Sequence, residues 1–225
     1  MLSAAVLACI VPSAFAQVSM TLTSPGAGNV MDNVYTSPYT ATVGGQTGVP
    51  IICDDFADDS YINESWTATV STVASLASNV KWGTSDQRGY DEAAWLAEQL
   101  LASNNPTTMG YMSYAIWYAL DPTDVITYLT TTDPDSTTLS EAKYYAGQAA
   151  AQSFYAGEFS NVLVYTPDLN DPITCSGVGC PTAPPQEFLR VVTPEAPTPI
   201  IFAVDLLGLI SLLAILRKRK IFDLA

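Results

Sequence analysis

The stretch Ile52-Cys53-Asp54-Asp55-Phe56-Ala57-Asp58-Asp59-Ser60-Tyr61 carries one cysteine and four carboxylates within seven residues. Cys53 ends the apolar run 49–53, and the carboxylates follow it. The apolar run predicts a short buried strand, and the aspartates predict a solvated loop in which they cap turns. Carboxylate oxygens are also the ligands that Ca²⁺ prefers. Calcium stays a secondary alternative, because no glycine turn of a calcium loop lies among the four candidates, Asp54, Asp55, Asp58 and Asp59.

Further strands are predicted on both sides of this run. Segments in which apolar and polar residues alternate, or which are rich in Thr and Tyr, predict strands at 18–23, 34–43, 65–73, 162–165 and 187–192. The glycine-rich segment 44–48 predicts a hairpin connection between two of these strands.

Three helices are predicted in the middle of the chain, at 90–103, 108–120 and 139–156. Asn105-Pro106 and Asp121-Pro122 mark the ends of the first two, and Gly157 is placed to cap the third. Leu100 and Leu101 are expected on the buried face of the first helix. Strands, then helices, then strands predict an α+β fold: an antiparallel β-sheet or sandwich domain with an inserted helical cluster.

The first sixteen residues predict a secretory signal peptide. They form an apolar run that ends in Ala14-Phe15-Ala16, a small-x-small pattern of the kind that signal peptidase cleaves. Cleavage is expected after Ala16, which leaves residues 17–192 as the exported domain.

The C-terminal segment predicts a membrane helix. Residues 200–216 are apolar except for Asp205 and Ser211, and would span ~25 Å as a helix, the lower edge of what crosses a bilayer. The basic cluster after them would stay on the cytoplasmic side. That cluster is Arg217, Lys218, Arg219 and Lys220.

Residues 193–220 resemble the PEP-CTERM sorting signal of Gram-negative bacteria. The resemblance rests on the motif Pro194-Glu195-Ala196-Pro197, the short apolar segment and the terminal basic cluster, although Ala196 stands where the family has a second proline. It implies that an exosortase-type enzyme processes the chain at this motif before delivery to the cell surface. A plain C-terminal anchor is the alternative.

The charge balance restricts the partners of the exported domain. The chain has 22 acidic and 8 basic residues, a net charge of −14, and half of the basic residues form the terminal cluster. Nucleic acid and anionic lipid headgroups are therefore poor partners for the domain, whereas exopolysaccharide or other envelope components are compatible with it. The chain has no histidine, so the commonest general base and transition-metal ligand is missing, and we expect no metal or cofactor.

Three cysteines remain after removal of the predicted signal peptide. Cys175 and Cys180 flank a short loop that contains two glycines and are expected to form a disulfide in an oxidising compartment. Cys53 is then the odd cysteine. It is a candidate reactive thiol, a candidate for an intermolecular disulfide, or a small buried apolar residue.

Segments 49–56, 92–96 and 113–117 together resemble exported PEP-CTERM proteins of soil bacteria and, more distantly, the thioester domains of Gram-positive surface adhesins, over residues 49–165. In those adhesin domains a strand cysteine attacks a glutamine amide, and the resulting thioester captures an amine on a partner. Cys53 and Trp117 match the cysteine and tryptophan of the pattern. Ser113 stands where the pattern has glutamine, which predicts that the covalent trap is absent unless another glutamine, such as Gln99, supplies the acyl group.

The sequence therefore predicts a non-enzymatic surface or extracellular-matrix protein. One alternative is an adhesin-type binding module that uses Cys53 covalently. A third possibility is a secreted hydrolase with a pair of carboxylates, for which the sequence nominates no pair.

Overall fold

The computed structural model describes residues 15–25, 30–132, 134, 137–175 and 184–192. The chain divides into two compact units, Met1–Val192 and Thr193–Ala225, and all described residues belong to the first. None of the described helices is both long and apolar enough to cross a bilayer. The predicted signal peptide up to residue 14, the sorting motif, the membrane helix 200–216 and the basic cluster lie outside the described residues.

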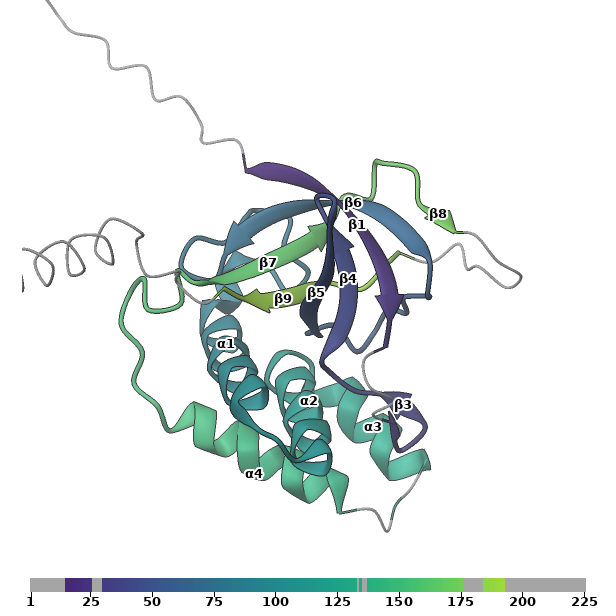
Figure 1. Cartoon of the computed structure of the whole chain (residues 1–225). Coiled ribbons are helices and arrows are strands. Elements are labelled where there is room, and N and C mark those ends of the chain that lie inside the picture. Colours follow the sequence, from purple (N-terminus) through teal and green to yellow (C-terminus); the bar gives the residue numbers. More distant parts are fainter. Residues whose placement is uncertain (1–14, 26–29, 133, 135–136, 176–183, 193–225) are drawn as a thin grey trace, which may run out of the picture. The chain divides into compact units, whose positions relative to one another are not determined.

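The central element is an antiparallel sheet that closes on itself (Figure 1). The order β1-β4-β5-β9-β7-β6 is closed by pairing of β6 with β1, where Ala16 faces Val70 and Thr21 faces Ser65. The α+β class is confirmed, but the sheet forms a small barrel rather than a sandwich. The strands are β1 (Ala16–Ser24), β4 (Tyr39–Val43), β5 (Gln46–Cys53), β6 (Glu64–Thr72), β7 (Val162–Pro167) and β9 (Phe188–Val191).

Three short strands accompany the barrel. β2 (Val30–Met31) and β3 (Val34–Tyr35) form a separate hairpin, and the Tyr114 hydroxyl of the helical cluster donates to the Met31 carbonyl (3.1 Å). The predicted strand 34–43 is thus two strands, separated by a cis Ser37-Pro38 bond. β8 (Thr174–Cys175) pairs with the start of β6.

The hairpin between β4 and β5 has a two-residue turn. Gly44 (φ +57°) and Gly45 (φ +84°) occupy its central positions, where both residues need a positive φ for the turn to match the strand twist. A Cβ atom on Gly44 would also lie 3.0 Å from the Val18 side chain. The predicted hairpin is confirmed, and β5 begins directly after it at Gln46.

The helical cluster is inserted between β6 and β7 and covers one end of the barrel (Figure 1). Asn105 caps the second helix, because its side chain accepts from the N–H groups of Thr107 and Thr108, and Pro106 occupies the first turn. The elements are the short η1 (Thr84–Asp86) and the helices α1 (Gln87–Ala102), α2 (Pro106–Leu120), α3 (Pro122–Thr132) and α4 (Thr138–Ala150).

The helices differ from the prediction at three points. Pro122 ends α2 but also begins α3, because proline is accepted at the first position of a helix. The last helix ends at Ala150, so Gly157 (φ +86°) lies in the following turns and does not cap it. Leu101 is exposed, whereas Leu100 is buried as expected.

The core lies where α2 meets the open end of the barrel. Trp117 is 1% exposed, and its ring packs against Phe56 (5.0 Å between centroids) and Tyr114 (4.9 Å). Each large apolar side chain buried here contributes roughly 2 kcal/mol to folding. Phe56 comes from the loop after β5, so this core holds the end of β5 in place.

Candidate functional site

Cys53 lies at the last position of β5, fully buried, and three hydrogen bonds fix it. Its Sγ donates to the Asp55 carbonyl (3.1 Å), its N–H donates to Ser37 Oγ (3.1 Å), and its carbonyl accepts from Trp117 Nε1 (3.0 Å). Burial, followed by the charges of Asp55 and Asp54, raises the pKa of the Cys53 thiol well above its usual value. The sulfur is therefore a neutral thiol in the folded protein.

The structure brings Ser113 and Trp117 to Cys53, as the pattern of segments suggested. Ser113 Oγ accepts from the Ser37 N–H (3.0 Å) and donates to the Met109 carbonyl (3.0 Å). Ser37 in turn holds the Cys53 N–H. Ser113 thus positions Cys53 indirectly, through Ser37. Both hydrogen bonds of the Ser113 hydroxyl hold backbone groups in place.

Gln186 is the functional candidate that the sequence analysis missed. Its Nε2 donates to the Asp55 carbonyl (2.7 Å), the same oxygen that accepts from the Cys53 thiol. The thiol and the carboxamide therefore meet at one atom. Gln99, the acyl donor suggested from the sequence, lies on α1 and has no hydrogen bond to Cys53 among those found in the described part of the chain.

Strand pairing explains how Gln186 reaches this position. Cys53 pairs with Phe188 across β5 and β9, and the Asp54 N–H donates to the Glu187 carbonyl (3.4 Å), which extends the ladder by one residue. Continuing the register places Gln186 across from Asp55 and diagonal to Cys53. Diagonal cross-strand neighbours have Cβ atoms about 7 Å apart, within reach of a long side chain such as glutamine.

A buried pair of carboxyl groups lies beside this centre. Glu187 accepts from Tyr90 Oη (2.5 Å), Thr166 Oγ1 and the Lys81 N–H (3.1 Å), whereas neither oxygen of Asp54 has a hydrogen-bond donor. Burial, followed by the neighbouring Glu187 charge, raises the pKa of Asp54 well above its usual value, and burial also raises that of Glu187. Burial therefore favours the protonated form of Asp54 beside Glu187, whose two oxygens already accept from protein donors.

Asp55 and Asp58 bind a lysine. Lys81 Nζ lies 3.2 Å from Asp55 Oδ2 and also contacts Asp58 Oδ2, and Asp55 Oδ1 caps the loop by accepting from the N–H groups of Ala57 and Asp58 (3.0 and 3.3 Å). Asp54 is fully buried and lies across from Glu187, to whose carbonyl its N–H donates, and Asp59 is exposed. The four calcium candidates therefore do not converge. Within the described ranges, no group of three or more Cys, Asp or Glu residues could hold a metal ion.

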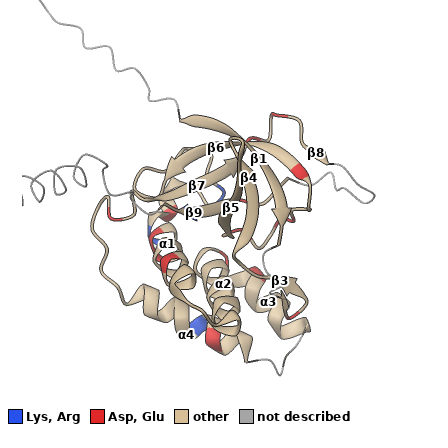
Figure 2. Ribbon diagram, in the orientation of Figure 1, with Lys and Arg blue, Asp and Glu red and all other residues tan. Residues whose placement is uncertain are grey.

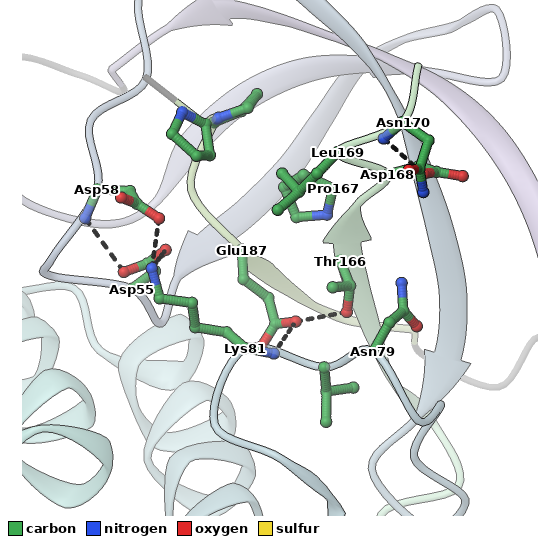
Figure 3. A pocket seen from close by; sticks show the side chains of 13 residues that line it. Asp55, Asp58, Asn79, Lys81, Thr166, Pro167, Asp168, Leu169, Asn170 and Glu187 are labelled. Atoms are coloured by element: carbon green, nitrogen blue, oxygen red, sulfur yellow. Dashed lines mark hydrogen bonds and ion pairs between the residues drawn. The ribbon is translucent and has the colours of Figure 1, made fainter.

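A cavity of about 560 Å³ opens next to the cysteine centre. Figure 3 shows Glu187 between Asp55 and Asp58 on one side and Asp168 and Asn170 on the other. Pro185 and Glu187, the two neighbours of Gln186 in the chain, both line it. The lining has four carboxyl groups and the single cation Lys81, and Figure 2 marks more acidic than basic positions along the ribbon.

The comparisons with known proteins leave the geometry as the only guide. No protein-family model, curated protein or solved structure matches this chain.

Cys53 is the free cysteine among the described residues. Cys175 ends β8 and takes part in a disulfide, but Cys180 lies outside the described residues, so the pairing of these two stays a prediction.

A thiol and a primary carboxamide held together can condense. Attack of Cys53 Sγ on Gln186 Cδ forms a thioester, and the amide nitrogen leaves as ammonia with the thiol proton. Holding both groups on one carbonyl favours such a reaction through proximity. Cys53 is fully buried, whereas Gln186 is half-buried.

Proposed function

We propose that this chain is an exported, non-enzymatic surface protein whose domain captures a partner covalently through an internal Cys53–Gln186 thioester. The observation that carries the proposal is the shared acceptor: Cys53 Sγ (3.1 Å) and Gln186 Nε2 (2.7 Å) both donate to the Asp55 carbonyl. Cys53 and Gln186 are 133 positions apart in sequence, so only the fold brings them together.

Burial of the thiol is compatible with this role. A raised thiol pKa slows attack in water, but the bond forms once, inside the fold, and needs no sustained turnover. The product is neutral, so it is better suited to a buried site than a thiolate. The same burial protects the thioester until a nucleophile arrives.

Partial exposure of Gln186 supports access from outside, because its side chain is half-buried whereas Cys53 is fully buried. The cavity lies alongside: Asp55, the common acceptor, and the chain neighbours Pro185 and Glu187 line it, although Cys53 and Gln186 do not. An outside nucleophile that reaches the half-buried Gln186 would attack Gln186 Cδ and release Cys53 as a thiol. Because capture happens once for each protein molecule, the proposed role is binding and not catalysis.

Export and sorting are proposed from the chain ends. Signal peptidase would cleave after Ala16, and an exosortase-type enzyme would process the motif Pro194-Glu195-Ala196-Pro197. Envelope proteins or exopolysaccharide are then the available partners. The strongly acidic composition, with a net charge of −14, supports this location over a role with nucleic acid.

The intact mass of the secreted protein tests the proposal. We expect a deficit of one ammonia that maps to the peptides of Cys53 and Gln186 and not to the new N-terminal Gln17, which can itself lose ammonia by cyclisation. This deficit should be lost in Cys53→Ala and Gln186→Ala, and the wild type should add one methylamine. Gln99→Ala serves as the control and should keep the deficit. A wild-type mass without the deficit, together with a titratable thiol after denaturation, contradicts the proposal.

One other function has a specific observation in its favour: a purely structural matrix protein in which Cys53 is only packing. Cys53 is 0% exposed, as an inert core cysteine would be. The mass measurement separates this function from covalent capture, because only a thioester gives the ammonia deficit. The hydrolase reading has weaker support, because both oxygens of the buried Glu187 are already occupied by protein donors.

A further inference from the structure

We propose that Asp58, together with Asp55, holds Lys81 as a non-nucleophilic ammonium beside the Cys53–Gln186 centre, and so reserves the thioester for an outside nucleophile. This inference rests on the proposed thioester. It assigns to Asp58 the role of a positioning residue, which acts through Lys81 and does not touch the reacting atoms.

Asp55 connects the lysine to the reactive pair. Its backbone carbonyl accepts from Cys53 Sγ and Gln186 Nε2, and its side-chain Oδ2 lies 3.2 Å from Lys81 Nζ. Lys81 lines the same cavity as Asp55, Pro185 and Glu187. A single residue, Asp55, therefore links the Lys81 amine to the reactive pair. Lys143, the other lysine of the described ranges, lies on α4.

The lysine backbone is fixed, so the position of its amine depends on the two carboxylates. The Lys81 N–H donates to Glu187 Oε2 (3.1 Å), and the next residue is held by a hydrogen bond from Trp82 Nε1 to the Asp54 carbonyl (3.3 Å). Only the flexible side chain can then move. Its Nζ contacts both Asp58 Oδ2 and Asp55 Oδ2, and the hydrogen bond to Asp58 is the first of the interactions that raise the pKa of Lys81.

Self-capture is the reaction that this restraint prevents. A neutral Lys81 amine that attacks Gln186 Cδ forms an isopeptide bond, the Cδ–Sγ bond breaks, and the amine proton passes to the Cys53 thiolate. Burial lowers the pKa of the Lys81 amine, but the hydrogen bonds and charges of Asp58 and Asp55 outweigh burial and raise the pKa overall. An ammonium has no free electron pair, so it cannot attack.

The test compares Asp58→Asn with Asp59→Asn, which removes the same charge from an exposed neighbour. In Asp58→Asn we expect the ammonia deficit to remain, methylamine uptake to fall to a small fraction of the wild-type value, a Cys53 thiol to appear on denaturation, and a Lys81–Gln186 cross-linked peptide in the digest. Asp59→Asn and Lys143→Met should match the wild type. Asp58→Asn/Lys81→Met should regain methylamine uptake, and this rescue also shows that the variant folds.

The outcomes separate the two proposals. Wild-type methylamine uptake in Asp58→Asn, without the cross-linked peptide, overturns the role of Asp58 and leaves the thioester standing. Failure of the double variant to regain uptake also overturns it, because the loss would then not depend on the lysine amine. Absence of the ammonia deficit in the wild type removes the thioester and this inference with it.

Discussion

At the scale of single residues, one carbonyl organises the site. The Asp55 oxygen accepts from a thiol and a carboxamide, and the Asp55 side chain pairs with Lys81. The residues around it fix Cys53 from three directions: Asp55 at the sulfur, Ser37 at the N–H and Trp117 at the carbonyl. Removing a support should therefore reduce bond formation even where the reacting atoms are untouched.

Trp117→Phe should destabilise the domain and lower the thioester yield. The substitution leaves the buried Cys53 carbonyl without its donor, a loss of about 1–3 kcal/mol, in addition to the packing lost around the smaller ring. Urea unfolding measures the loss of stability, and the ammonia deficit measures the thioester yield. Tyr144→Phe, at a 59% exposed position, is the control and should change neither. Unchanged yield in Trp117→Phe would show that this hydrogen bond does not position the cysteine.

Stability should depend on pH through Asp54 and Glu187. Burial raises the pKa of both groups, so between the ordinary carboxyl range and their raised values the folded state keeps protons that the unfolded chain has released. The free energy of unfolding should therefore decrease as the pH rises through this window. Asp54→Asn should flatten the pH profile of the urea midpoint. A profile in Asp54→Asn as steep as that of the wild type would contradict a raised pKa of Asp54 as its source.

At the scale of elements, local signals predicted most of the secondary structure. Gly44-Gly45 predicted a turn because few other residues adopt a positive φ at both positions, and Asn105-Pro106 predicted a helix boundary because Asn caps and Pro fits the first turn. Pro122 was misread because the residue that ends one helix also starts the next. Gln186 could not be predicted, because its place beside Cys53 comes from the pairing of β9 with β5.

Two glycine substitutions should have opposite effects on stability. Gly44→Ala introduces a Cβ atom 3.0 Å from Val18 at a φ of +57° and should destabilise the domain by about 1–2 kcal/mol. Gly147→Ala lies inside α4 with open space around it and should stabilise by about 0.5–1 kcal/mol. Thermal unfolding of the two variants provides the comparison. Equal shifts in the same direction would contradict the turn geometry.

At the scale of the whole molecule, the barrel depends on its last strand. β9 lies between β5 and β7 and pairs with both, although β5 precedes it by more than 130 residues. Without β9 the two strands would face each other across a gap, with unpaired N–H and C=O groups. The helices inserted between β6 and β7 make this closure a long-range event.

A chain of residues 17–192 should therefore fold, whereas a chain of residues 17–183 should not. The shorter chain lacks β9, Gln186 and the buried Glu187. Near-ultraviolet circular dichroism and the dispersion of amide proton signals would distinguish the two. A cooperative thermal transition in the shorter chain would contradict the role of β9.

For the export and the thioester proposed above, the late position of β9 also sets the order of events. A polypeptide that crosses the membrane unfolded has its thiol and its carboxamide far apart, so it carries no thioester during transport. The electrophile comes into being only after the final segment has arrived and docked, on the side of the membrane where a target is present. In this proposal, the requirement that the chain folds first prevents the thioester from forming before export is complete.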